Sequence, residues 1–264
     1  MPWAKRRLGQ HFLADPRILA RIADALEAGP DDTVLEIGPG HGGLTAALAA
    51  RAGQVVAIEK DRDLVPSLRA RFPAVTIVEG DALDLDWHGL LPNSFLLAGN
   101  IPYNITSPLL DKALVPPLPR RIVFLVQKEV ADRVTANPGT SEYGALSVGI
   151  QSAARAERLF TVVAGAFQPR PKVDSAVLRL TPLARPLVSD AERESFRAAV
   201  VGLFSYRRKQ LLRGVRELTG WEASRASDLL QRAAIWPTVR PEVLGPAEFV
   251  QLHRALVDGG WRPR

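Results

Sequence analysis

The amino-acid sequence predicts a doubly wound α/β fold, with a mostly parallel sheet that ends in an antiparallel pair, followed by a small all-helical C-terminal domain. Short apolar, β-branched runs alternate with helical patterns along the first half of the chain, as parallel strands with crossover helices require. Two later runs lie too close together for a crossover helix, so they should be antiparallel. From Ser189 onward helical periodicity dominates, which predicts the helical domain.

The individual elements follow from these patterns. The runs expected as buried parallel strands are residues 33–37, 55–58, 75–78, 95–98 and 122–126. The segments with helical patterns are residues 44–52, 63–71 and 127–134. The antiparallel pair is expected at residues 157–163 and 176–180, joined by a Pro-rich loop. Ser189 and Ser224 are the expected N-caps in the helical part.

Length and charge favour two unequal domains. The 264 residues, 47% of them hydrophobic, can form one sizeable core and a small second domain. Pro182 and Pro186 mark the boundary, which predicts domains at residues 1–184 and 185–264. The first carries 20 basic and 19 acidic residues and the second 14 and 9, so nearly all of the net charge of +6 lies in the second. This asymmetry indicates a basic appendage for a polyanionic partner.

Several classes of site and location are excluded or disfavoured by composition. The absence of cysteine excludes disulfides, thiolate zinc sites and a cysteine nucleophile, and the four histidines have no metal-ligand spacing. No run of about 18 apolar residues occurs, and the basic start lacks the apolar run of a secretory signal. We therefore expect a cytoplasmic protein, acting as a monomer, that uses neither a metal nor a membrane.

A glycine-rich turn follows the first predicted strand and leads into a helix. In Gly38-Pro-Gly-His-Gly-Gly43, only glycine lets the backbone and the helix N-terminus approach a ligand closely. Gly38, Gly40 and Gly43 also fit the dinucleotide fingerprint, so the glycines alone do not separate NAD from S-adenosylmethionine. Glu59, at the end of the second strand, can accept ribose hydroxyls, and Asp81, after the third, can accept a cofactor adenine amine. A surface acid and a helix cap are the alternative interpretations.

The tetrapeptide Asn100-Ile-Pro-Tyr103 directly follows the fourth predicted strand, so it should face the same crevice. Such a tetrapeptide is typical of methyltransferases that act on planar exocyclic amines. The N6 lone pair of adenine is delocalised into the ring, and acceptors for both amine hydrogens favour a more nucleophilic, tetrahedral nitrogen. The Asn100 side-chain oxygen and the Ile101 carbonyl, fixed by Pro102, are the expected acceptors. Tyr103 offers a face to an unstacked base, worth roughly 1–3 kcal/mol.

Phe167 has two possible roles. It lies in Phe167-Gln-Pro-Arg-Pro-Lys-Val-Asp-Ser175, on the loop expected between the late strands. There its ring can close the other face of the target base, or it can be an ordinary core phenylalanine. The sequence leaves both roles open.

Taken together, six motifs make the chain similar to the small-subunit (16S) ribosomal RNA adenine N6,N6-dimethyltransferases, the family whose loss gives kasugamycin resistance in bacteria. The motifs are Leu8-Gly-Gln-His-Phe-Leu13, Leu35-Glu-Ile-Gly-Pro-Gly40, Gly99-Asn-Ile-Pro-Tyr-Asn104, Gln127-Lys-Glu-Val-Ala-Asp-Arg133, Phe167 to Ser175 and Arg207-Arg-Lys-Gln-Leu211. The resemblance implies S-adenosylmethionine as methyl donor and dimethylation of two adjacent adenosines in the 3′-terminal hairpin of the RNA, within a precursor of the small subunit. The cofactor contacts that it implies are His11, Leu13, Gly38, Gly40, Glu59, Asp81 and Asn100. His11 stands where many relatives have asparagine, and Ile101 where many have leucine or proline.

Two basic runs are candidate phosphate contacts, with a solvated charge cluster as the alternative. They are Arg207, Arg208 and Lys209, expected on a helix, and Lys5, Arg6 and Arg7 near the start. Other activities compete with the small-subunit assignment: methylation of large-subunit RNA, methylation of DNA, or a non-catalytic role in ribosome assembly or transcription. The 127–133 and 167–175 segments favour the small subunit, and the intact tetrapeptide and glycine turn favour catalysis.

Overall fold

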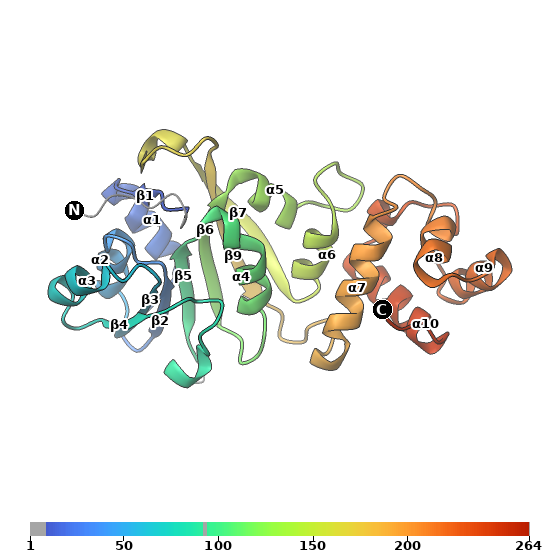
Figure 1. Ribbon diagram of the computed structural model, residues 1–264, viewed down its shortest axis with the longest axis horizontal. Coiled ribbons are helices and arrows are strands. Elements are labelled where there is room, and N and C mark those ends of the chain that lie inside the picture. The colour runs from blue at the N-terminus through green and yellow to red at the C-terminus, as the bar shows by residue number, and fades with distance from the viewer. Residues whose placement is uncertain (1–8, 92–93, 264) are drawn as a thin grey trace. The chain divides into compact units, whose positions relative to one another are not determined.

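A computed structural model describes residues 9–91 and 94–263, and its chain divides into two compact units (Figure 1). The sheet unit comprises Met1–Ala131 and Arg155–Pro182, and the helical unit comprises Asp132–Ala154 and Leu183–Arg264. The last crossing between units, after Pro182, lies two residues before the expected boundary. Asp132–Ala154, however, belongs to the helical unit, because Tyr143 and Val148 are buried in the core of that unit.

A seven-stranded sheet forms the centre of the sheet unit, with the strand order β4-β3-β2-β5-β6-β9-β7. Its strands are β2 (Thr33–Ile37), β3 (Gln54–Glu59), β4 (Thr76–Glu79), β5 (Leu96–Asn100), β6 (Arg121–Gln127), β7 (Ala154–Val162) and β9 (Ser175–Pro182). The five strands from β4 to β6 are parallel, β9 is antiparallel to β6, and β7 lies beside β9 at the edge. The predicted fold class is therefore confirmed.

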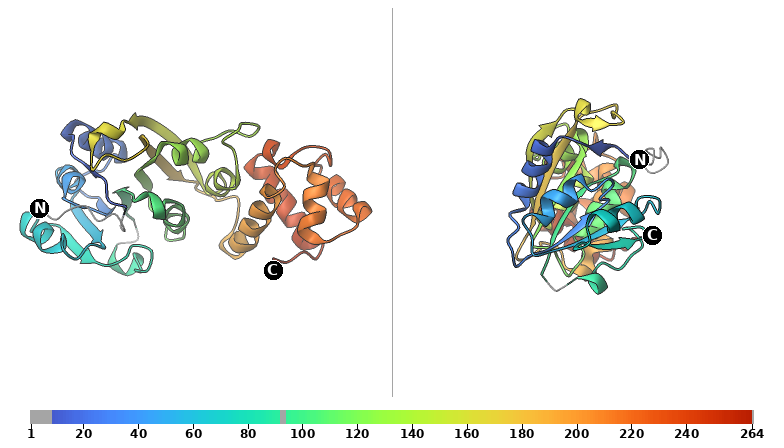
Figure 2. Two further views of the ribbon diagram at one scale, coloured as in Figure 1. Left: turned by 45° about the horizontal axis from the view of Figure 1, so that its top comes forward. Right: turned by 90° about the vertical axis from the view of Figure 1, so that its left-hand side faces the viewer.

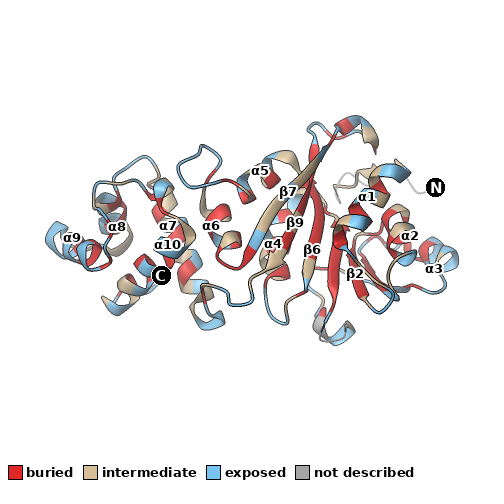
Figure 3. Cartoon of the chain, turned by 180° about the vertical axis from the view of Figure 1, so that it is seen from behind, coloured by how far each residue is buried: buried red, intermediate tan, exposed pale blue. Residues whose placement is uncertain are grey.

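Helices cover both faces of this sheet, which explains why its central strands are apolar along their whole length (Figure 3). Figures 1 and 3, seen from opposite sides, show α4 on one face and α1 on the other. The helices and 3-10 turns of this part are α1 (Pro16–Leu26), α2 (Gly43–Ala49), α3 (Val65–Arg71), η2 (His88–Leu90), η3 (Tyr103–Ile105), α4 (Thr106–Ala113), α5 (Lys128–Val134) and η4 (Ala164–Ala166). The boundary between the units falls inside α5.

Helix α1 joins the N-terminal segment to the sheet. Asp15 caps the helix, because its carboxylate accepts hydrogen bonds from the backbone N–H groups of Arg17 and Ile18, at 2.8 and 3.4 Å. The apolar side chains spaced one turn apart on α1, including Leu19, Ile22 and Leu26, are buried against the sheet. The residues just before α1 are thereby held next to the carboxyl ends of the parallel strands.

A second, two-stranded sheet pairs β1 (Phe12–Leu13) with β8 (Phe167–Gln168) in antiparallel register. Phe12 lies opposite Gln168, and Leu13 opposite Phe167. Figure 2 shows the blue N-terminal segment beside the yellow segment that contains β8. The sequence predicts only a loop at residues 167–175, because the paired residues of these two-residue strands are 156 and 154 positions apart, which leaves no local periodicity.

The helical unit is an all-helical bundle around its own core. Its elements are α6 (Ala145–Gln151), η5 (Asp190–Glu192), α7 (Arg193–Phe204), α8 (Leu211–Thr219), α9 (Ala223–Arg232), η6 (Pro241–Val243) and α10 (Pro246–Asp258). Ser189 caps η5, as predicted, but Ser224 is not a cap: α9 begins at Ala223 with Glu222 as its N-cap. Among the described helices none is both long and apolar enough to span a bilayer.

Candidate active site

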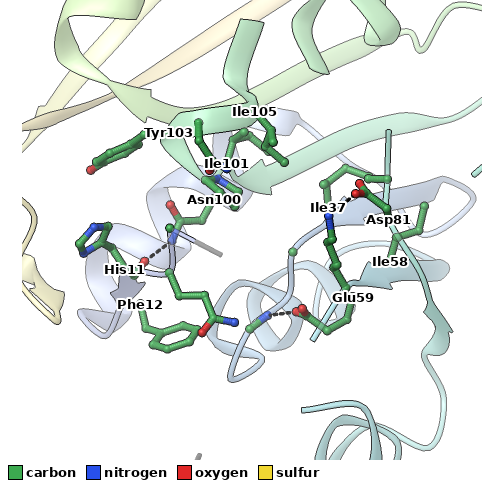
Figure 4. Close-up of a pocket in the computed structure, with 18 of the residues that line it drawn as sticks. His11, Phe12, Ile37, Ile58, Glu59, Asp81, Asn100, Ile101, Tyr103 and Ile105 are labelled. Atoms are coloured by element: carbon green, nitrogen blue, oxygen red, sulfur yellow. Dashed lines mark hydrogen bonds and ion pairs between the residues drawn. The ribbon is translucent and has the colours of Figure 1, made fainter. Parts of the chain in front are cut away.

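A pocket lies at the carboxyl ends of the parallel strands, where the sequence placed its candidate residues (Figure 4). The expected residues that line it are Gly38, Gly40, Glu59, Asp81, Asn100, Ile101, Pro102 and Tyr103, and His11 joins them from the N-terminal segment. Figure 4 shows Asn100, Tyr103 and His11 on one side of the pocket and Glu59 and Asp81 on the other. Parallel strands that end at one edge of a sheet thus bring together residues from five separate stretches of the chain.

The glycine turn adopts a backbone conformation that other residues rarely reach. Gly38 and Gly40 have φ angles of +69° and +58°, in the left-handed region. A Cβ atom on Gly40 would lie 2.8 Å from the ring of Phe12, so this glycine also permits the N-terminal segment to close over the turn. The N–H of Gly40 donates to Glu59 Oε2 at 3.0 Å, which links the turn to the end of β3.

Glu59 is buried, and its carboxylate is fixed in place by backbone N–H groups. Oε2 accepts from Gly40, and Oε1 accepts from the N–H of Asp61 at 2.7 Å. Burial raises the pKa of Glu59, and these hydrogen bonds partly counteract it. Each carboxylate oxygen has a second lone pair, so Glu59 can still accept hydroxyls of a ribose in the pocket.

Asp81 is held at the other end of the same pocket. Its Oδ1 accepts from the N–H of Leu83 at 2.9 Å, and its Oδ2 pairs with Lys60, a residue that the sequence analysis did not single out. Burial acts to raise the pKa of Asp81, but the hydrogen bond and charge of Lys60 hold it below its usual value. Asp81 therefore presents a charged acceptor, although it also caps the turn that follows β4.

The orientation of the Asn100 amide is set by the N-terminal segment. Asn100 Nδ2 donates to the backbone carbonyl of His11 at 2.8 Å, so Oδ1 is left as an acceptor toward the pocket. The Ile101 side chain is buried, its N–H donates to the Leu125 carbonyl at 3.0 Å, and its own carbonyl accepts no hydrogen bond from any residue that the structure describes. Two adjacent oxygen acceptors are thus available in the tetrapeptide.

Tyr103 is anchored through its hydroxyl, which lies 2.8 Å from Ser175 Oγ at the start of β9. Burial raises the pKa of Tyr103, so its hydroxyl stays protonated at neutral pH. The His11 ring stacks on Tyr103, with centroids 5.5 Å apart and planes 25° apart, and its Nδ1–H donates to the Pro169 carbonyl at 2.8 Å. The second aromatic ring at this side of the pocket is therefore that of His11, and not that of Phe167.

Phe167 lies where a core phenylalanine would, away from the position expected for closing over the target base. Its side chain is 5% exposed, packs in the core of the sheet unit and does not line the pocket among the described residues. The cause is the β1–β8 pairing, which places Phe167 opposite Leu13 and turns both side chains into the core. Leu13 lines an adjoining cavity on the other side of the glycine turn.

Glu36 lines that adjoining cavity too, and the sequence analysis did not name it as a candidate. It is 1% exposed, Oε2 has no hydrogen-bond partner among the described residues, and burial raises its pKa to about 8. The available signal was one acid within an otherwise apolar strand. A cationic ligand group beside this carboxyl would favour its ionised form. The acceptors Glu36, Glu59 and Asp81 therefore fit the ammonium, ribose and adenine groups of S-adenosylmethionine.

The candidate phosphate contacts Arg207, Arg208 and Lys209 lie in a turn between α7 and α8, rather than on a helix as expected. Successive turn hydrogen bonds, from Arg207 N–H to Phe204 O and from Lys209 N–H to Tyr206 O, end the helical ladder there. Arg207 is paired with Glu242 at 2.6 Å. Arg208 and Lys209 are exposed, and neither has an ion-pair partner within the described parts of the chain. Lys5, Arg6 and Arg7 lie outside the described residues.

In residues 9–91 and 94–263 no group of three or more His, Asp or Glu side chains is arranged to hold a metal ion. Over residues 2–235 the chain matches a family model described as ribosomal RNA adenine dimethylase. It is 44% identical over 266 residues to the ribosomal RNA small subunit methyltransferase A of Geobacter metallireducens, covering 97% of both chains. It is 41% identical over 260 residues to the protein of that name from Bordetella avium, with the same coverage.

Solved structures show the same relationship. The chain is similar to a dimethyladenosine transferase from Plasmodium falciparum, with a TM-score of 0.81 and 26% identity over 95% of this chain and 98% of that one. It is also similar to the 23S rRNA methyltransferase ErmE, with a TM-score of 0.72 and 31% identity over 93% of this chain and 99% of that one. Both similarities extend over nearly the whole chain, beyond the sheet unit alone.

Proposed function

The chain belongs to the ribosomal RNA adenine dimethylase family, and from this premise we propose that it dimethylates N6 of two adjacent adenosines in the 3′-terminal hairpin of small-subunit ribosomal RNA. The observation that carries the proposal is the pair of oriented acceptors, Asn100 Oδ1 and the Ile101 carbonyl, in the pocket beside Tyr103. Relatives named for the small subunit are 39–44% identical to it, whereas the 23S enzyme is 31% identical. This difference supports the small subunit as the source of the RNA.

S-adenosylmethionine is the methyl donor, and it supplies an electrophilic methyl group at the pocket. Glu59 and Asp81 are placed to hold its adenosine part through ribose hydroxyls and the adenine amine. The Glu36 carboxyl, which lines the adjoining cavity with Gly38, can accept from its ammonium group, whose charge would favour the ionised carboxylate. Glu36 lies within β2, Glu59 ends β3 and Asp81 follows β4. Because these strands are neighbours, the sheet sets the spacing of the three acids.

The tetrapeptide activates the target amine through its acceptors. Asn100 Oδ1 and the Ile101 carbonyl can each accept one N6 hydrogen, which favours a tetrahedral nitrogen whose lone pair is available for attack. Tyr103 supports the flipped base by stacking. No strong general base is required, because the N6 cation formed by methyl transfer loses its proton readily.

The same acceptors explain why transfer stops after two methyl groups. An N6-monomethyl amine retains one hydrogen and can still be held by one acceptor, so it can react again. A dimethylated amine has no hydrogen left, and the buried acceptors that held it become unpaired. Asn100 and Ile101 therefore bind the final product less well than the substrate.

Recognition of the RNA is proposed to involve the basic helical unit. Arg208 and Lys209 are free to contact phosphates, which fixes register without reading sequence. The substrate is proposed to be a precursor of the small subunit, methylated in the cytoplasm by a monomeric enzyme. Lys5, Arg6 and Arg7 are proposed as further phosphate contacts. The intact acceptor pair favours catalysis over a purely structural role in assembly.

The direct test is to incubate small ribosomal subunits that lack the modification with the protein and S-adenosylmethionine, and to map methylated adenosines by mass spectrometry. The wild type should dimethylate two adjacent adenosines near the 3′ end. Asn100→Ala should abolish the transfer, whereas Asn137→Ala, the same change at an exposed position of the helical unit, should not. Label appearing only in large-subunit RNA or DNA would refute the substrate, and no label in any of them would favour a non-catalytic binding factor.

A further inference from the structure

The net positive charge of residues 185–264 comes from one stretch of the chain. Residues 207–240 carry eight arginines and lysines against three acidic residues. The flanking ranges 185–206 and 241–264 carry three basic and three acidic residues each, so they are neutral. The entire excess charge of the C-terminal part therefore lies on α8, α9 and the turns before and after them.

Trp236 lies within this stretch and is 77% exposed, the most exposed large hydrophobic side chain of the described residues. The two other tryptophans of the unit differ from it. Trp261 is buried, and the ring of Trp221 is covered by the Arg225 guanidinium at 4.0 Å. No cation or aromatic ring of the described residues covers Trp236. An uncovered indole within a basic stretch offers a flat face on which an unpaired nucleobase can stack.

The backbone around Trp236 is fixed by hydrogen bonds and by the burial of a neighbouring side chain. The preceding Ile235 is buried in the helical core. The carbonyls of Pro237 and Val239 accept from the N–H groups of Leu212 and Leu211, at 3.0 and 2.7 Å. These bonds hold the turn that contains Trp236 on the first turn of α8, next to the Arg208-Lys209 pair.

The cations near this turn are available to a ligand. Arg208 and Lys209 are exposed and immediately precede Gln210, the N-cap of α8. Arg240, at the other end of the Trp236 turn, is 58% exposed at its side chain and has only a long 3.7 Å contact with Glu242. Such surface pairs contribute little and are readily exchanged for phosphate. The turn that contains Trp236 is therefore adjoined by Arg208 and Lys209 before α8 and by Arg240 at its own end.

We propose that Trp236, Arg208 and Lys209 form a second RNA-binding site, in which an unpaired nucleobase stacks on the indole and the adjoining phosphates contact the two cations. This inference rests on the proposed function, because it takes RNA as the substrate. Every nucleobase has a π-face, so such a site accepts unpaired bases of any sequence but not a base inside a duplex. RNA is favoured over a protein partner because the stretch carries eight basic residues against three acidic ones, a charge that matches a phosphate backbone.

Binding is tested without cofactor, with two fluorescent probes: a single-stranded oligoadenylate of 12 nucleotides and an RNA duplex of 12 base pairs. Trp236→Ala should weaken binding of the single strand about ten-fold, leave duplex binding unchanged and leave the salt dependence of both unchanged. Trp236→Phe should retain most of the affinity. The double variant of Arg208→Ala and Lys209→Ala should weaken binding of both probes and reduce the slope of affinity against salt. Val201→Ala, half-exposed in the same unit, is the matched control.

Single-strand binding by Trp236→Ala at wild-type affinity would overturn the proposal. An equal loss on both probes would also overturn it, because stacking requires an unpaired base. If Trp236→Ala weakened binding to intact small subunits but to neither RNA probe, the exposed indole would be assigned to contact with a ribosomal protein instead. These outcomes are independent of methyl transfer: absence of methylation on subunits would refute the proposed function while leaving the binding result as measured.

Discussion

Glu36→Gln is expected to make the protein more stable, by an amount that grows with pH. The Glu36 carboxyl is 1% exposed, Oε2 lacks a partner among the described residues, and burial raises its pKa to about 8 from an ordinary 4.5. Between these values the folded chain holds a proton that the unfolded chain has released. The free energy of unfolding therefore falls as pH rises through this window, by up to about 1.4 kcal/mol per pH unit. Glutamine has the same shape and never ionises.

The two proteins should have similar stability below about pH 4, where the carboxyl is mostly protonated in both states. At pH 7, about 2.5 pH units above the ordinary pKa, the glutamine variant should be more stable by roughly 3 kcal/mol. Urea unfolding of both proteins at pH 5, 6, 7 and 8 measures the difference, and contributions from other groups, including Glu59, largely cancel in it. Glu79→Gln, an exposed acid at the end of β4, is the control. A difference that does not change with pH would refute the assignment of a proton to Glu36.

Two further substitutions test how the pocket is supported. Lys112 Nζ donates to the carbonyls of Leu83 and Leu85, at 2.8 and 2.6 Å, in the turn that follows Asp81, so Lys112→Met should raise the Kd of S-adenosylhomocysteine several-fold in calorimetric titration. An unchanged Kd would show that this turn keeps its place without the lysine. Tyr103→Ala should lower kcat/KM in a tritium-transfer assay by about 5- to 150-fold, the equivalent of roughly 1–3 kcal/mol of stacking. Tyr103→Phe keeps the ring and should lose only a few-fold, and equal losses in the two variants would contradict a stacking role.

Much of the fold could be predicted because its strands are buried on both faces. A run such as residues 122–126, apolar and β-branched throughout, has no exposed face to blur its pattern, and the observed β6 extends only one residue beyond it at each end. The cofactor side of the pocket followed from the same topology, since residues directly after parallel strands must meet at one edge. Gly38, Glu59, Asp81 and Asn100 were placed together on that argument, and all four line the pocket.

The contacts that could not be predicted join distant parts of the chain. Nothing in the local sequence of Phe167 shows that it pairs with Leu13, and this pairing decides whether its ring enters the core or the pocket. Likewise, Asp132–Ala154 follows the last parallel strand and precedes the antiparallel pair, so sequence order placed it in the sheet unit. It belongs to the helical unit because Tyr143 is buried there and donates to the Leu244 carbonyl at 2.8 Å.

The N-terminal segment shows how such a distant contact can govern the chemistry. Asn100 is oriented by the carbonyl of His11, 89 residues earlier in the chain, so the acceptor that its amide turns toward the pocket depends on where β1 lies. The contact uses the backbone carbonyl of position 11. The side chain of His11 makes separate contacts, because its ring stacks on Tyr103. A change from histidine to asparagine at this position would therefore keep the orienting carbonyl, but it would remove the ring that stacks on Tyr103 and its hydrogen bond to the Pro169 carbonyl. The orientation of the Asn100 amide thus depends on where β1 places the backbone of position 11, and it is independent of the side chain at that position.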